Sequence, residues 1–119
     1  MRLMCVEDNT TNVNLYKRIA LARKYEFSFY TSAEAALLDF NKIDPHVVIV
    51  DANLDGNMSG MEMARIVRAK RKSIGIIVIT AYSSEEPDCA KIGCDAFFLK
   101  PLPVTELYHL LLDFEERVR

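Results

Sequence analysis

The chain has 119 residues, a length typical of one domain; half of them are apolar and 27% are charged. Its net charge of −2, without a basic stripe, argues against direct binding to nucleic acid. No apolar run approaches a membrane span, and the segment Met1–Val6 is too short for a signal peptide. We therefore expect one cytoplasmic domain over residues 1–119, with no membrane partner and with its three scattered cysteines reduced.

Short apolar runs alternate along the chain with segments of helical spacing. Apolar runs of about four residues that are rich in Val and Ile predict strands buried on both faces of a parallel sheet. In chain order we predict a strand over Leu3–Val6, a helix over Thr11–Lys24, a strand over Phe27–Tyr30, a helix over Ser32–Asn41, a strand over Val47–Val50, a helix over Met61–Lys70, a strand over Ile76–Ile79, a short helix over Glu86–Ile92, a strand over Ala96–Leu99 and a helix around Leu107–Phe114.

The helical segments differ in the quality of their patterns. The segment Thr11–Lys24 carries a broad apolar face that extends to Ala22. The segment Glu86–Ile92 is the weakest, with Pro87 near its start and Gly93 at its end. Five strand–helix repeats with short loops predict an α/β fold: an open parallel sheet with helices on both faces and right-handed crossovers.

Polar and charged side chains follow the predicted strands where the chemistry of such folds is found. In open parallel sheets, ligands bind at the carboxyl ends of the strands. Glu7 and Asp8 follow the first strand, Asp51 the third, Thr80 the fourth and Lys100 the fifth. We therefore expect three carboxylates, a hydroxyl and an ammonium group at one edge of the sheet.

Such a cluster predicts a divalent cation and phosphoryl chemistry. Three neighbouring carboxylates repel one another unless a cation is bound, and ligand oxygens with open positions suit Mg²⁺. Asp51, at the end of the central run, is the candidate nucleophile for forming an acyl phosphate. The alternative for Glu7 and Asp8 is that they cap the first helix, where acids are favoured. The basic segment Arg65–Lys72 is interpreted as a solvated helix end.

Several motifs also carry a family resemblance over the whole chain. They are the opening Glu7-Asp8-Asn9-Thr10-Thr11-Asn12, the acid Asp51, the segment Gly60–Arg68, the pair Thr80-Ala81, the segment Gly93–Leu99 and the pair Lys100-Pro101. In this order and spacing they resemble the receiver domains of two-component response regulators. The E-D-N-x-x-N opening is similar to that of receivers attached to hybrid sensor kinases.

The resemblance implies a flavodoxin-like (βα)5 three-layer sandwich with strand order 2-1-3-4-5. It implies Asp51 as the phosphoacceptor, with Mg²⁺ or Mn²⁺ held by the carboxylates of Asp8 and Asp51 and the backbone carbonyl of Asn53, and with Glu7 acting through water. The phosphate donor would be a histidine kinase or a histidine phosphotransfer protein. The domain would catalyse only its own phosphorylation and dephosphorylation, and it would act on a downstream protein or an attached output domain.

The resemblance further implies a switch. Lys100 would pair with the phosphoryl oxygens. The peptide bond between Lys100 and Pro101 would be cis. Thr80 would move toward the phosphoryl group and let the Phe97 ring turn inward, which remodels the surface of the fourth helix, fifth strand and fifth helix. Phosphorylation would thus bias a two-state element by adding charge and acceptor oxygens.

Three features depart from the family pattern. The loop after Asp51 lacks the usual proline and is one residue longer, and its Asp55 is expected to be a solvent-facing turn residue. The stretch between Thr80 and Gly93 is about two residues shorter, which predicts a stunted fourth helix and an uncommon partner contact there. Finally, we expect Tyr82 to shield the phosphoryl group from water.

Two other functions remain as alternatives at this stage. A pseudo-receiver would keep the fold and serve as a phosphorylation-independent binding or dimerisation module. An aspartyl phosphatase usually has a second Asp two residues after its nucleophile, and that position here is Asn53.

Overall fold

The structure is a computed structural model that describes residues 1–118. Its elements are β1 (Arg2–Val6), α1 (Thr10–Arg23), β2 (Glu26–Tyr30), α2 (Ala33–Ile43), β3 (Val47–Asp51), α3 (Gly60–Lys70), β4 (Gly75–Thr80), the 3₁₀ turn η1 (Ser83–Glu85), α4 (Glu86–Ile92), β5 (Ala96–Leu99) and α5 (Val104–Arg117). The strands form one sheet in the order β2-β1-β3-β4-β5, and each neighbouring pair is parallel. The expected fold class and strand order are confirmed.

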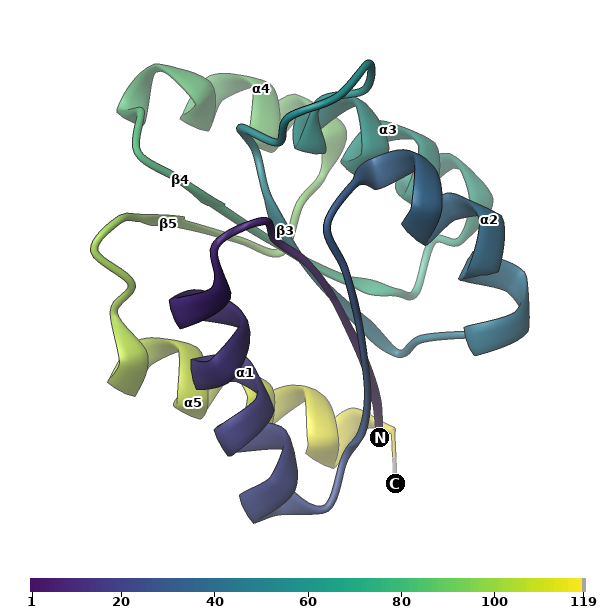
Figure 1. Cartoon of the computed structure of the whole chain (residues 1–119), viewed down its shortest axis with the longest axis vertical. Coiled ribbons are helices and arrows are strands. Elements are labelled where there is room, and N and C mark those ends of the chain that lie inside the picture. The colour runs from purple at the N-terminus through teal and green to yellow at the C-terminus, as the bar shows by residue number, and fades with distance from the viewer. Residues whose placement is uncertain (119) are drawn as a thin grey trace.

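Helices cover both faces of the sheet (Figure 1). α1 and α5 lie on one face, and α2, α3 and α4 lie on the other. Successive side chains of a strand point to opposite faces, so Val48 and Val50 join the apolar cluster under α2 and α3, whereas Val47 and Ile49 join the cluster under α1 and α5. The central strands are apolar at nearly every position because both of their faces are covered.

The two edge strands contradict the expectation of burial on both faces. Phe29 of β2 is 52% exposed and Leu99 of β5 is 44% exposed, and no residue of either strand is fully buried. An edge strand has a neighbour on one side only, and the helix layers cover it incompletely. The short apolar runs could not reveal this, because strand order decides which strands lie at the edge.

The first three helices begin at capping side chains. Asn9, Ser32 and Ser59 each accept a hydrogen bond from a backbone N–H three residues further along the chain. Because Asn9 is the cap of α1 and the first turn of α1 contains no acid, the capping alternative for Glu7 and Asp8 was wrong. Neither Glu7 nor Asp8 therefore serves as the cap of α1.

Two other helix predictions have opposite outcomes. The stunted fourth helix is confirmed: α4 has seven residues, carries Pro87 in its first turn and ends at Gly93 in the left-handed conformation. In α1, by contrast, Ala22 is exposed, although the apolar pattern placed it on the buried face. The buried face of α1 is narrower than predicted and centres on Tyr16 and Ala20.

Among residues 1–118, no helix combines the length and the apolar character that a transmembrane segment needs. The three cysteines carry free thiols; Cys5 and Cys89 are buried and Cys94 is partly buried. That the thiols are reduced in the cell stays a prediction.

Charged side chains at the amino ends of the strands are paired within the chain. Arg68 of α3 donates to the backbone carbonyls of Lys72 (2.7 Å) and Ile74 (2.9 Å), and its other nitrogen lies 2.9 Å from Asp95 Oδ2. Arg71 forms an ion pair with Asp44. The interpretation of Arg65–Lys72 as a solvated helix end was therefore wrong for these two arginines, which tie loops at this edge together.

A structural histidine lies at the same edge. The ring nitrogen Nδ1 of His46 accepts a hydrogen bond from the backbone N–H of Arg2 at 2.8 Å. The Arg2 guanidinium in turn reaches Asp44, with 3.2 Å between Nη2 and Oδ2. We call Arg2, Asp44, His46, Arg68, Arg71 and Asp95 the amino-edge cluster.

Candidate functional site

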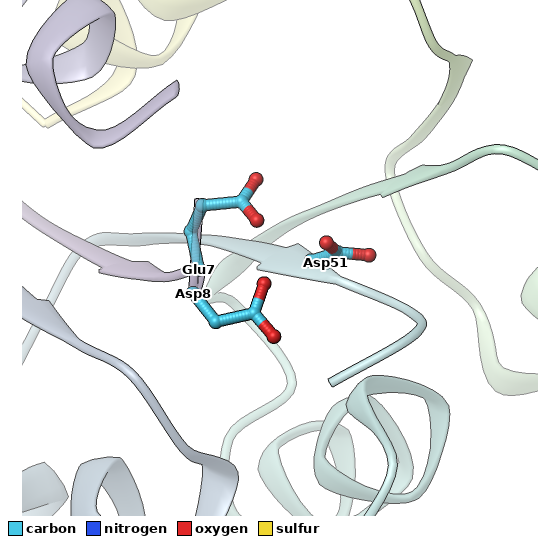
Figure 2. Close-up of side chains that lie close together, drawn as sticks. All are labelled: Glu7, Asp8 and Asp51. Atoms are coloured by element: carbon cyan, nitrogen blue, oxygen red, sulfur yellow. The ribbon is translucent and has the colours of Figure 1, made fainter. Parts of the chain in front are cut away.

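Three acids meet at the carboxyl edge of the sheet. Glu7 and Asp8 directly follow β1, and Asp51 is the last residue of the neighbouring strand β3. One carboxylate oxygen from each residue lies within 4.8 Å of the others. Figure 2 shows the three side chains reaching into one common space. The parallel register of β1 and β3 causes this, because both strands end at the same level.

Glu7 is buried although it is an acid. It is 1% exposed, and Oε1 accepts a hydrogen bond from the side-chain amide of Asn12 at 3.1 Å. Burial, together with a hydrogen bond and repulsion from Asp51, raises the pKa of Glu7 to about 7. Asn12 thus orients a carboxylate that shares its site with another acid.

Asp51 is held in its ionised form. Its Oδ2 lies 2.8 Å from Lys100 Nζ, and its Oδ1 accepts the backbone N–H of Asn53 at 2.9 Å. Burial alone raises the pKa of this carboxyl group, but hydrogen bonds from Lys100, Glu7 and Asn53 outweigh burial and lower the pKa. Lys100 precedes a cis peptide bond to Pro101, so that expectation is confirmed.

The charges of this site fit a divalent cation. Three carboxylates are crowded together with one ammonium group, and the raised pKa of Glu7 reflects that crowding. Asp8 is exposed and faces solvent, which leaves room for waters on a cation. Oxygen ligands with open positions are what Mg²⁺ and Mn²⁺ take beside phosphate groups.

The loop after Asp51 is fixed from outside by α2. The Met58 N–H donates to Glu34 Oε1 at 2.7 Å. At the end of the loop, a Cβ on Gly60 would lie 1.9 Å from the Asp51 carbonyl oxygen, so only glycine lets α3 start against the backbone of this acid. Asp55 is exposed and lies outside the acidic cluster, as expected of a turn residue.

Thr80 lies at the end of β4 and is fully buried. Its hydroxyl oxygen is 2.7 Å from Asn53 Oδ1 and 2.6 Å from Glu85 Oε1, and it accepts the backbone N–H of Tyr82 at 3.1 Å. Asn53 also donates its side-chain amide to Glu85 at 3.1 Å. The Thr80 hydroxyl therefore belongs to a triangle with an amide and a carboxylate.

The two remaining expected site residues lie further out. Phe97 of β5 is partly buried and packs against the apolar cluster under α2 and α3. Tyr82 is 59% exposed. That Tyr82 shields a phosphoryl group stays a prediction.

The carboxyl edge brings together Glu7, Asp8, Asp51 and Lys100, with Asn53 and Thr80 beside them. Sequence reasoning missed the roles of Glu34 and Glu85. Both are acids in helical or turn segments, and no local pattern distinguishes them from solvated surface residues. Asn12 belonged to the opening motif, so its place in the motif was the signal that could have revealed its contact with Glu7.

Comparison with known proteins decides the family. Residues 3–112 match the family model described as the response regulator receiver domain. The chain belongs to this family. Receiver domains are signalling modules of two-component systems and work with histidine kinases and output domains.

The relatives are distant but span most of the chain. The sensory transduction protein RegX3 of Mycobacterium tuberculosis is 29% identical over 107 residues, which cover 88% of this chain and 46% of RegX3. The polar-differentiation response regulator DivK of Brucella abortus is 28% identical over 106 residues, covering 86% of this chain and 85% of DivK. The chain thus spans about half the length of RegX3 and most of the length of DivK.

Solved structures show the same fold. A CheY-like receiver domain protein from Methanospirillum hungatei superimposes with a TM-score of 0.87 at 22% identity, covering 97% of this chain and 94% of that one. The response regulator TrrA from Thermotoga maritima, solved in complex with Mg²⁺-BeF, gives a TM-score of 0.83 at 29% identity, covering 95% of this chain and 97% of TrrA.

Proposed function

We propose that this receiver domain accepts a phosphoryl group on Asp51 in a Mg²⁺-dependent reaction. The donor would be a phosphohistidine on a histidine kinase or a histidine phosphotransfer protein. The observation that carries the proposal is the Asp51 carboxylate: it is 3% exposed, lies beside two other acids, and has one oxygen 2.8 Å from Lys100 Nζ. A nucleophile, a cation partner and a metal-binding group of oxygens are thus combined in one place.

The proposed reaction moves one phosphoryl group between two proteins. An oxygen of Asp51 forms a P–O bond while the P–N bond of the donor breaks. The electron pair of the P–N bond goes to the ring nitrogen, and the donor leaves as neutral imidazole when its other nitrogen carries a proton. The lowered pKa of Asp51 keeps the attacking carboxylate ionised at neutral pH.

The acidic residues support the metal requirement. Asp8 and Asp51 would bind the ion directly with the Asn53 carbonyl, and Glu7 would act through water. When bound, the ion neutralises phosphoryl oxygens. TrrA, a response regulator of the same fold, was solved in complex with Mg²⁺-BeF, which supports a metal requirement for this chain. Lys100, with Nζ 2.8 Å from Asp51 Oδ2, supplies the second positive charge.

The output is proposed to arise through Thr80 and Phe97. The Thr80 hydroxyl lies beside Asn53, the second residue after Asp51, within reach of the phosphorylation site. Phe97 is partly buried against the apolar cluster under α2 and α3, and a shift of Thr80 would give its ring room to turn inward. A downstream protein or an attached output domain would read the resulting surface of α4, β5 and α5.

The test is intact-mass analysis after incubation with acetyl phosphate, with and without Mg²⁺. We expect the mass of one phosphoryl group to be added only with Mg²⁺, and not in Asp51→Asn. Asp55→Asn is the matched control, because Asp55 is an exposed acid in the adjacent loop. No mass gain with any donor would overturn the proposal and favour a pseudo-receiver that binds partners independently of phosphorylation.

A further inference from the structure

Glu85 stands out among the residues between β4 and α4. It is the last residue of η1 and is partly buried, whereas Ser83, Ser84 and Glu86 are exposed. Its carboxylate points back toward the site, with Oε1 2.6 Å from the Thr80 hydroxyl oxygen and 3.1 Å from the Asn53 side-chain nitrogen. The short connection brings this acid within reach of two residues of the proposed site.

In this arrangement the Thr80 hydroxyl has hydrogen-bond partners both as a donor and as an acceptor. The hydroxyl oxygen accepts the Tyr82 N–H, and its single proton has two acceptors within reach, Glu85 and Asn53. A carboxylate is the stronger acceptor, since hydrogen bonds to ionised groups are shorter and stronger than neutral ones. Thr80 is fully buried, so water offers its hydroxyl no other partner.

We infer that Glu85 is a positioning residue that holds the Thr80 hydroxyl in the unphosphorylated domain and must release it when Asp51 receives a phosphoryl group. The inference rests on the proposed function and deepens it. One hydroxyl proton cannot serve both the Glu85 carboxylate and a phosphoryl oxygen. Among residues 1–118, no hydrogen bond joins Thr80 to Asp51, in keeping with a hydroxyl engaged elsewhere.

The same contact connects the site to the start of α4. Glu85 immediately precedes α4, and its side chain does not cap that helix. Its carboxylate instead fastens the beginning of α4 to Thr80 and Asn53. Release of Glu85 therefore frees the amino end of a seven-residue helix that belongs to the proposed output surface.

The test compares Glu85→Gln, which keeps the shape and removes the charge, with Glu86→Gln as the matched control on the next, exposed residue. With acetyl phosphate and saturating Mg²⁺, we expect Glu85→Gln to accelerate phosphoryl uptake about threefold to tenfold, because an ionised acceptor of the Thr80 hydroxyl is replaced by a weaker, neutral one and a repelling charge is removed. Glu86→Gln should stay within about twofold of the wild type. In a Thr80→Ala background, the acceleration by Glu85→Gln should shrink, because no hydroxyl remains to be released.

A second measurement needs no phosphorylation. NMR spectra of the metal-free protein should show the Asn53 side-chain amide and the Tyr82 backbone amide shifting in Glu85→Gln and not in Glu86→Gln. Equal or slower phosphoryl uptake by Glu85→Gln, or unchanged amide signals, would overturn the inference while the proposed function stands. No uptake by the wild type itself would overturn the proposed function, and the inference with it.

Discussion

Charged residues are arranged differently at the amino edge of the sheet, where the strands begin, and at its carboxyl edge, where the strands end. At the amino edge, Arg68 and Asp95 pair with each other, and Arg68 also satisfies backbone carbonyls. At the carboxyl edge, Glu7, Asp8 and Asp51 crowd together, and the ion pair there joins Asp51 to Lys100. In the first arrangement, the arginines are paired with aspartates of the same chain. The second has an excess of negative charge that burial makes costly.

This difference separates residues that stabilise the fold from residues that are held ready for a ligand. A protein tolerates a crowded acidic cluster at a cost in stability when a bound cation or phosphoryl group later offsets it. Changes at the amino edge should therefore affect stability and spare phosphoryl uptake. Removal of an acid at the carboxyl edge should impair phosphoryl uptake and raise the stability of the metal-free protein.

The largest effect is expected for Arg68→Ala. The change leaves the carbonyls of Lys72 and Ile74 and the carboxylate of Asp95 without their cationic donor. We expect the free energy of unfolding to fall by about 2–3 kcal/mol, measured by urea denaturation. Phosphoryl uptake of the folded variant should be unchanged.

Arg65→Ala is the matched control, since Arg65 is an exposed residue of the same helix. Its unfolding free energy should stay within about 0.5 kcal/mol of the wild type. If the unfolding free energy of Arg65→Ala fell as much as that of Arg68→Ala, the specific contacts of Arg68 would not be what stabilises the amino edge.

A smaller effect of opposite sign is expected for Glu7→Gln. Without metal, removal of one buried carboxylate beside Asp51 should raise the free energy of unfolding by about 1–2 kcal/mol. Mg²⁺ should then raise the melting temperature of the wild type more than that of the variant, because the ion offsets the repulsion that the variant lacks. Asp55→Asn serves as the control. If metal-free Glu7→Gln were less stable than the metal-free wild type, repulsion between Glu7 and Asp51 would not lower the stability of the fold.

The smallest effect is a change in the pH dependence of stability at the amino edge. Burial and the nearby positive charge of Arg2 lower the pKa of His46 below its ordinary value of 6.5. The unfolded chain then binds more protons than the folded one, so stability falls as the pH falls through 6.5 toward the lowered pKa. A protonated Nδ1 also cannot accept the Arg2 N–H.

His46→Asn keeps an acceptor near this N–H and should flatten the decline in melting temperature between neutral and mildly acidic pH. His109→Asn, at an exposed position of α5, should leave that decline as it is in the wild type. If both variants show the wild-type profile, the His46 ring does not couple to folding.

Most of the fold could be predicted from the sequence because the patterns that indicate strands and helices are local. Apolar runs located all five strands to within one residue at each end, and the segment Glu86–Ile92 was predicted with the bounds that α4 has. Parallel connectivity then placed Asp51 and Lys100 at one edge, because every strand of such a sheet ends on the same side. Asp8 and Thr80 followed from the same rule.

Only the tertiary structure decided the contacts that cross between elements. The incomplete burial of Phe29 at the sheet edge, the hold of Glu34 on the loop after Asp51 and the link from Glu85 to Thr80 have no local signature. A carboxylate on a turn has the same sequence appearance whether it faces water or a buried hydroxyl. Its direction depends on the packing of segments distant in sequence.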